Sequence, residues 1–184
     1  MRKLRHDEIA AKRFPPDRLH AMDRFPIQAL LDNVRSLYNV GAIFRASDGA
    51  RISTLHLTGY TPYPPRKEIE KTALGATSTV PWNYQNNAIT VLESLKKNGI
   101  TICVLEQTNQ SIPYFELPLS RFPLCLVVGN EITGISKEII NQADIAIDIP
   151  MYGLKQSLNV AVAYGIVVYD FVRRLHEQLI EPPK

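Results

Sequence analysis

The sequence Ile149-Pro150-Met151-Tyr152-Gly153-Leu154-Lys155-Gln156-Ser157-Leu158-Asn159 separates a short β-type run from the most apolar helical pattern of the chain. Residues 145–149 are predicted to form a buried strand, and residues 158–179 a helix. A strand, a loop and a helix in this order are typical of α/β proteins, in which ligands bind where strands end. The segment is therefore a first candidate for a binding site.

The rest of the chain repeats this alternation of strands and helices. Strands are predicted at 26–31, 53–57, 80–82, 100–105, 124–128 and 145–149, and helices at 39–50, 68–74, 88–98, 136–143 and 158–179. Asn39 is the predicted N-cap of the first helix. The pattern predicts an α/β fold with a mostly parallel sheet and flanking helices. With 184 residues, of which 45% are hydrophobic, we expect one globular domain over residues 25–184.

Residues 1–24 form a predicted basic arm. They hold seven of the 21 basic and four of the 18 acidic residues, so the whole net charge of +3 lies there. A basic arm on a neutral body favours a polyanionic partner, although an ordinary solvated extension has the same composition.

Several functional classes find no support in the sequence. The apolar stretch at 160–172 is too short and too interrupted for a membrane span, and the N-terminus lacks a signal-type apolar run, so we expect a cytoplasmic protein. Cys103 and Cys125 lie inside apolar runs and are expected to be buried, reduced thiols. The four histidines are scattered, so no metal site is predicted. Walker A, GxGxxG and GxSxG motifs are missing.

Two further clusters also follow predicted strands. One is Asn33-Val34-Arg35-Ser36-Leu37-Tyr38-Asn39-Val40-Gly41-Ala42-Ile43-Phe44-Arg45, and the other is Gly129-Asn130-Glu131-Ile132-Thr133-Gly134-Ile135-Ser136. Taken alone, the second cluster is equally compatible with a plain tight connection between a strand and a helix. Because the ends of parallel strands meet at one edge of a sheet, we expect both clusters beside the 149–159 segment.

In this order, the three clusters resemble the motifs of the SpoU (TrmH-like) RNA 2′-O-methyltransferases of the SPOUT superfamily, and the resemblance covers roughly residues 27–174. One small departure is Ala161, where the family often has serine. The resemblance implies transfer of a methyl group from S-adenosylmethionine to a ribose 2′-hydroxyl of RNA, with tRNA favoured over rRNA. It also implies a deep C-terminal trefoil knot, a topology that is otherwise rare, and a homodimer.

The family pattern assigns the cofactor mainly to backbone groups of five positions. These are Leu105, Gly129, Ile149, Met151 and Leu158. Small and apolar side chains suit such a pocket, because the backbone supplies the specific hydrogen bonds. Without the family pattern, Ile149, Met151 and Leu158 would equally suit an ordinary core.

The resemblance also implies the catalytic residues. They are Arg45, Asn39, Glu131, Ser157 and Asn159. Arg45 is the expected catalytic arginine: it would hold a phosphate and stabilise a developing alkoxide, since a guanidinium normally stays protonated. A surface ion pair is the alternative for Arg45, and a structural role is the alternative for the four polar residues.

RNA phosphates would meet Arg35, Arg66, Lys71 and the arm. Recognition would then come from the arm, the catalytic loops and a second subunit, with the apolar helix from Leu158 onward as the expected interface. Two other readings stay open: a non-catalytic RNA-binding protein that keeps the knot fold, and an α/β enzyme with another nucleotide cofactor.

Overall fold

The computed structural model describes residues 1–11 and 23–180. Within the predicted basic arm it contains α1 (His6–Ala10), whereas Lys12, Arg13 and Arg18 lie outside the described residues. In the described part of the chain, no helix is long and apolar enough to cross a membrane, and no three metal-ligating side chains come together.

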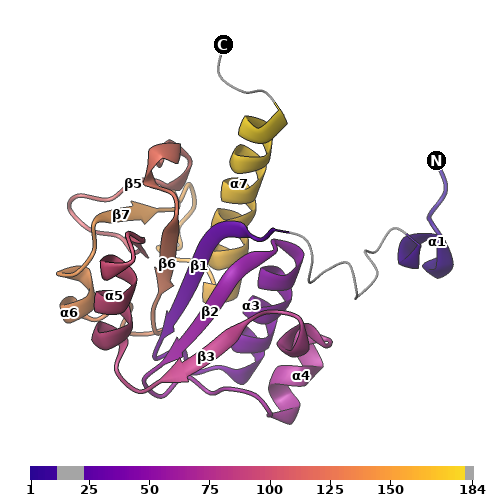
Figure 1. The fold of residues 1–184 in the computed structure, drawn as a ribbon, viewed down its shortest axis with the longest axis horizontal. Helices are drawn as coiled ribbons and strands as arrows, with labels where there is room; N and C mark the ends of the chain where they lie inside the picture. The colour runs from indigo at the N-terminus through magenta and orange to yellow at the C-terminus, as the bar shows by residue number, and fades with distance from the viewer. Residues whose placement is uncertain (12–22, 181–184) are drawn as a thin grey trace.

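A single sheet of seven strands forms the centre of the protein (Figure 1). The strands are β1 (Phe25–Asp32), β2 (Ile52–Thr58), β3 (Trp82–Gln85), β4 (Thr101–Leu105), β5 (Ile112–Pro113), β6 (Leu124–Val128) and β7 (Ile145–Asp148), in the spatial order β3-β2-β1-β6-β4-β7-β5. Every pairing between these strands is parallel. The predicted α/β class with a parallel sheet is confirmed.

Helices cover both faces of the sheet. They are α3 (Leu37–Gly49), α4 (Lys67–Ala73), α5 (Ala88–Lys97), α6 (Lys137–Ile140) and α7 (Val160–Ile180), with short 3₁₀ turns η1 (Ala76–Ser78), η2 (Tyr114–Glu116) and η3 (Leu119–Arg121). Figure 1 shows α3, α4 and α7 on one side of the sheet and α5 and α6 on the other.

Side chains alternate between the two faces of the sheet along each strand, and a hydrophobic core lies on each face. In β1, Ile27, Ala29 and Leu31 pack toward α3 and α7, whereas Leu30 packs toward α5 and α6. Cys103 and Cys125 are buried free thiols, as predicted, and burial raises the pKa of both.

Several elements differ from the sequence-based expectations. Helix α6 covers only Lys137–Ile140 of the predicted 136–143, and α7 begins at Val160 rather than at 158. Helix α3 begins two residues earlier than predicted, and Asn39 is not its N-cap. Ser36 caps the helix instead, because its Oγ accepts a hydrogen bond from the Asn39 backbone N–H at 3.3 Å. Strand β3 lies at 82–85 rather than 80–82, and the two-residue β5 was not predicted.

Strand order places the three clusters at one edge of the sheet. The clusters follow β1, β6 and β7, and residues 106–107 follow β4. These four strands are neighbours in the order β1-β6-β4-β7, and all point the same way. Their carboxyl ends therefore meet, as ligand sites of open α/β sheets require.

Candidate active site

A cavity of about 560 Å³ lies at the carboxyl ends of β4, β6 and β7 and at the beginning of α7. All five residues predicted to hold the cofactor line it: Leu105, Gly129, Ile149, Met151 and Leu158. The structure thus brings together four stretches of chain that are far apart in the sequence.

Gly129 is required by the tight loop that forms one wall of this cavity. A Cβ atom at Gly129 would lie 2.5 Å from the carbonyl carbon of Gly134 and 2.6 Å from the backbone nitrogen of Ile135. The loop is closed by two backbone hydrogen bonds between Asn130 and Gly134, of 3.0 and 3.2 Å. Any larger residue at position 129 would push this wall away from β6.

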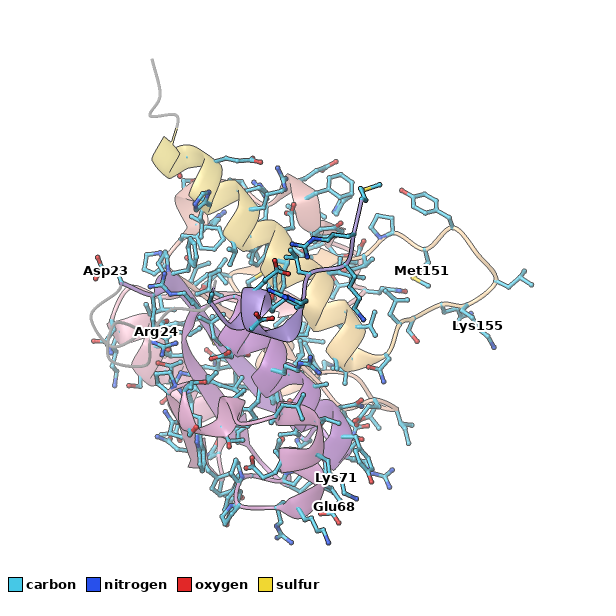
Figure 2. The ribbon with its side chains drawn as sticks, turned by 90° about the vertical axis from the view of Figure 1, so that its right-hand side faces the viewer. Asp23, Arg24, Glu68, Lys71, Met151 and Lys155 are labelled. Carbon is cyan, nitrogen blue, oxygen red and sulfur yellow. The ribbon has the colours of Figure 1, made fainter. Side chains whose placement is uncertain are left out.

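The 149–159 segment forms the opposite wall and leaves most of its backbone open. Figure 2 shows Met151 and Lys155 on a loop that projects from the body of the protein. Within the described chain, no backbone N–H group of residues 149–158 donates a hydrogen bond. The carbonyl of Gln156 accepts one from Gln107 Nε2 at 2.7 Å. Free N–H groups at a cavity suit a ligand that carries acceptor atoms.

The charge of the cavity distinguishes between cofactor classes. Glu106, Glu131 and Asp148 line it, and its described lining includes no lysine, arginine or histidine. An acidic cavity opposes the phosphates of a nucleotide cofactor and favours a positively charged sulfonium. S-adenosylmethionine therefore fits the residues present, whereas a phosphate-bearing nucleotide does not.

A chain of polar side chains joins the three clusters. Asn39 Nδ2 donates to Glu131 Oε1 at 2.8 Å, and Asn159 Nδ2 donates to Asn39 Oδ1 at 3.1 Å. Asn159 Oδ1 in turn accepts from the backbone of Ala161 and Val162, and so caps α7. Three predicted catalytic residues, from three segments, are thereby held in one line.

Glu131 is the anchor of this line. It also accepts hydrogen bonds from the backbone N–H groups of Arg35, at 2.9 Å, and Ser36, at 3.1 Å. Burial raises the pKa of Glu131, but hydrogen bonds from Arg35, Asn39 and Ser36 outweigh this effect, so the pKa is lowered overall. A carboxylate held in this way is suited to fix geometry and poorly suited to accept a proton.

Two other predicted catalytic residues lie differently. Ser157 lines the cavity. Arg45 instead lies in a second hollow of about 650 Å³, whose lining includes Lys71, Thr72 and Tyr169. Its side chain is exposed and forms no ion pair or hydrogen bond with the described residues. The structure therefore does not bring Arg45 to the line of Asn39, Glu131 and Asn159.

The predicted RNA-binding residues are all exposed. Arg35 precedes α3, Arg66 precedes α4, and Lys71 lies in the last turn of α4. In Figure 2, Lys71 lies at one end of the molecule, well away from Met151 and Lys155. Lys71 shares its hollow with Arg45, whereas Arg35 is tied to the cofactor cavity through Glu131.

Sequence reasoning assigned no role to three polar residues of the site. Glu106 accepts from the Ile135 backbone at 3.0 Å, and Gln107 reaches the 149–159 segment. Asn130 donates to the Asn33 carbonyl at 2.9 Å and to the Tyr60 hydroxyl at 2.8 Å. The available signal was their position, because each follows directly after a predicted strand.

Comparisons with known proteins agree with this geometry. The sequence profile of the SpoU rRNA Methylase family matches residues 26–169. The tRNA (guanosine(18)-2′-O)-methyltransferase of Aquifex aeolicus is 36% identical over 148 residues, which are 80% of this chain and 69% of that protein. The crystal structure of the A. aeolicus TrmH/SpoU tRNA modifying enzyme has a TM-score of 0.80 and 32% identity, and covers 90% of this chain and 84% of its own. The crystal structure of the AdoMet-bound rRNA methyltransferase of Sinorhizobium meliloti has a TM-score of 0.77 and 27% identity, and covers 89% of this chain and 62% of its own. As the order of its three motifs predicts, the chain belongs to the SpoU rRNA methylase family.

Proposed function

We propose that this chain is an S-adenosylmethionine-dependent RNA methyltransferase that modifies a ribose 2′-hydroxyl, with tRNA as the favoured substrate. The observation that carries the proposal is the line Glu131–Asn39–Asn159, which joins three segments at the acidic cavity. A non-catalytic RNA-binding protein would not need such an arrangement of polar side chains beside a ligand cavity.

The cofactor would be held by open backbone and by the acidic lining. When bound, S-adenosylmethionine supplies a methyl group on a positively charged sulfur. The backbone near Leu105, Gly129, Ile149, Met151 and Leu158 would bind its polar ends, since these residues line the cavity. Glu106, Glu131 and Asp148 supply negative charge around it.

Arg45 is assigned to the RNA rather than to the cofactor. It lies with Lys71 in the second hollow, so the two cations would bind one backbone phosphate and bring the adjacent ribose into position. Because a guanidinium stays protonated in proteins, Arg45 would stabilise the alkoxide rather than remove its proton. Ser157 and Asn159, at the beginning of α7, would orient the reacting groups.

We further propose that the segment after β7 threads through a preceding loop as a trefoil knot. The support is that residues 149–159 are bound from two separate parts of the chain: Gln107 donates to Gln156, and Asn159 donates to Asn39. A homodimer is proposed from α7, on which Val162, Ile166 and Tyr169 form an exposed stripe.

The choice between tRNA and rRNA as substrate rests on the names of similar proteins. The A. aeolicus relative is named a tRNA enzyme, and the S. meliloti neighbour an rRNA methyltransferase. The closer identity to the tRNA enzyme favours tRNA, with rRNA as the alternative, and we place the protein in the cytoplasm, where tRNA is found.

Calorimetry with S-adenosylmethionine tests the proposal directly. The chain is expected to bind S-adenosylmethionine, and failure to bind it, with binding of a phosphate-bearing nucleotide instead, would overturn the assignment. Mass spectrometry of RNA from a deletion strain would then identify the methylated nucleotide.

The variant Arg45→Ala is expected to bind the cofactor normally and to lose methyl transfer. The matched control is Arg121→Ala, at an exposed arginine that ends the 3₁₀ turn η3. Unchanged methyl transfer by Arg45→Ala would remove Arg45 from its proposed role.

A further inference from the structure

Exposed tyrosines gather where β2 and β3 end, and one of them, Tyr60, contacts a residue of the cofactor cavity. Tyr60 and Tyr63 follow β2, and Tyr84 lies in β3. Their exposed fractions are 61%, 44% and 36%. Aromatic rings of this size usually bury most of their surface. Three half-exposed rings in one neighbourhood therefore indicate a binding surface for a ligand.

Tyr60 is held in place at both ends while its ring stays exposed. Its backbone N–H donates to Asn33 Oδ1 at 3.1 Å, and its hydroxyl accepts from Asn130 Nδ2 at 2.8 Å. Asn130 itself lines the cofactor cavity. The ring of Tyr60 is therefore fixed one hydrogen bond away from the cavity wall.

Tyr63 and Tyr84 support each other. Their ring centroids are 4.4 Å apart at an angle of 37°, and the Tyr84 hydroxyl donates to the Gly59 carbonyl at 2.7 Å. The Tyr60 and Tyr84 hydroxyls are thus both engaged with the protein. Rings that are already ordered lose little conformational entropy when a ligand stacks on them.

Cationic residues lie close to the tyrosines in the sequence and at the cavity. Arg66 and Lys67 follow Tyr63 after two prolines, and Arg35 is joined through its backbone to Glu131 at the cavity. All three cationic side chains are exposed, and none forms an ion pair within the described chain. Basic groups beside exposed aromatic rings are the combination that proteins use to bind unpaired nucleotides.

We propose that Tyr60, Tyr63 and Tyr84 form a tyrosine platform on which unpaired RNA bases stack while the neighbouring ribose is methylated. The proposal rests on the proposed function and narrows its substrate class. Bases inside a duplex are already stacked on one another and cannot lie on these rings, so the target nucleotide would lie in or next to an unpaired stretch. Arg35, Arg66 and Lys67 would bind the phosphates without regard to pairing.

Two RNA probes of similar length distinguish stacking from charge. One is a hairpin with an unpaired loop, and the other is a blunt duplex. The double variant Tyr60→Leu/Tyr63→Leu is expected to bind the hairpin about 10- to 100-fold more weakly than the wild type, with little change for the duplex. Arg66→Ala should weaken both RNAs alike, since phosphates are present in both.

Two further variants serve as controls. Tyr60→Phe keeps the ring and should retain most of the hairpin affinity. Phe115→Leu removes an aromatic ring that is 48% exposed next to β5, at the opposite edge of the sheet, and should leave both affinities unchanged. Equal losses for hairpin and duplex in the double variant would overturn the tyrosine platform, as would no loss at all.

Wild-type protein gives a second readout that does not depend on the folding of a variant. A 2-aminopurine base in the hairpin loop should change its fluorescence on binding if it stacks, and an unchanged signal would contradict the proposal. Failure of the wild type to bind S-adenosylmethionine would instead overturn the proposed function. If the double variant binds the cofactor, transfers the methyl group and binds the hairpin as tightly as the wild type, the tyrosine platform is overturned and the proposed function stands.

Discussion

At the scale of single residues, Asn39 has a different role from the one its sequence position favours. An asparagine at the beginning of a helical pattern is a good N-cap, yet Ser36 takes that role. The Asn39 side chain is thereby left to bridge Glu131 and Asn159, two residues that are distant in sequence. Motif spacing alone predicts that Asn39 matters, but only the fold shows what it holds.

The variant Asn39→Ala removes both links of this line while leaving the Ser36 cap intact. Because Asn159 and Glu131 would no longer be joined, we expect methyl transfer to fall at least about tenfold. The free energy of unfolding should fall by about 1 kcal/mol for the lost hydrogen bonds. Steady-state kinetics, calorimetry with S-adenosylmethionine and urea unfolding measure the three quantities, and cofactor affinity should be unchanged.

Asn98→Ala provides the matched control. Asn98 ends α5 and donates a single hydrogen bond, of 2.8 Å, to the Ser94 carbonyl. Its loss should leave methyl transfer at the wild-type rate. If both variants lose transfer equally, or neither does, Asn39 has no special role in the reaction.

His56 makes the stability of the sheet depend on pH. It is 7% exposed, with Nε2 2.7 Å from Gln28 Oε1 and Nδ1 3.1 Å from Asn83 Oδ1. Burial lowers the pKa of His56 below the usual 6.5, although the hydrogen bond with Asn83 partly opposes this. The unfolded chain therefore binds more protons, so the stabilisation is present above about pH 6.5 and is lost as the pH falls.

We expect the free energy of unfolding to decrease between about pH 6.5 and pH 5, and His56→Gln to reduce this dependence. Urea titrations of both proteins across that range provide the measurement. Glutamine keeps a polar side chain between Gln28 and Asn83 but does not titrate. An identical pH dependence in the two proteins would show that other groups are responsible.

At the scale of elements, long periodic segments were predicted well and short ones were not. Helices α3, α4, α5 and α7 begin and end within two residues of their predicted ranges, because each presents an apolar face over about two turns or more. Helix α6 has only four residues, Lys137–Ile140, of the predicted range 136–143. Strand β5 has two residues, which is too short to show a period, and it forms by pairing with β7. Strand β3 was placed too early because Val80 is apolar, although Val80 packs in the core outside the strand.

Prediction of the site residues from the sequence has a similar limit. Motif order predicted that Leu105, Gly129, Ile149, Met151 and Leu158 belong together, and they line one cavity. It did not predict that Arg45 lies in a separate hollow. The direction of a side chain depends on how a helix is rotated against its neighbours, and packing between α3 and α4 sets that rotation.

Gly41 controls the packing of α3 against α4. A Cβ atom there would lie 2.1 Å from Thr72 Oγ1 and 2.3 Å from the Ile69 carbonyl oxygen. Because the carbonyl belongs to the backbone of α4, Gly41→Ala must push the two helices apart. We expect a loss of about 1–3 kcal/mol in the free energy of unfolding, measured by urea denaturation.

The same displacement should reduce methyl transfer, since α3 carries Arg45 and α4 carries Lys71. Gly153→Ala is the control, because nothing lies within 4 Å of its added Cβ atom. It should have wild-type stability. A Gly41→Ala protein as stable as the wild type would show that α3 and α4 approach less closely than described.

At the scale of the whole molecule, α7 has two faces with different partners. Tyr164, Val167, Val168 and Phe171 are fully buried against the sheet and α3. Val162, Ile166 and Tyr169 are 51%, 37% and 50% exposed and follow one another at helical spacing. An apolar stripe of this kind is costly in water, and a second copy of the chain can cover it through a two-fold axis.

The variant Ile166→Glu tests the proposed homodimer. A two-fold axis brings two copies of the same face together, so the substitution would place two carboxylates in the interface without partners. We expect the wild type to sediment as a dimer and Ile166→Glu as a monomer with unchanged circular dichroism. Gln178→Glu adds the same charge at an exposed polar position of α7 and should remain dimeric. A monomeric wild type, or a dimeric Ile166→Glu, would show that this stripe does not join two copies of the chain.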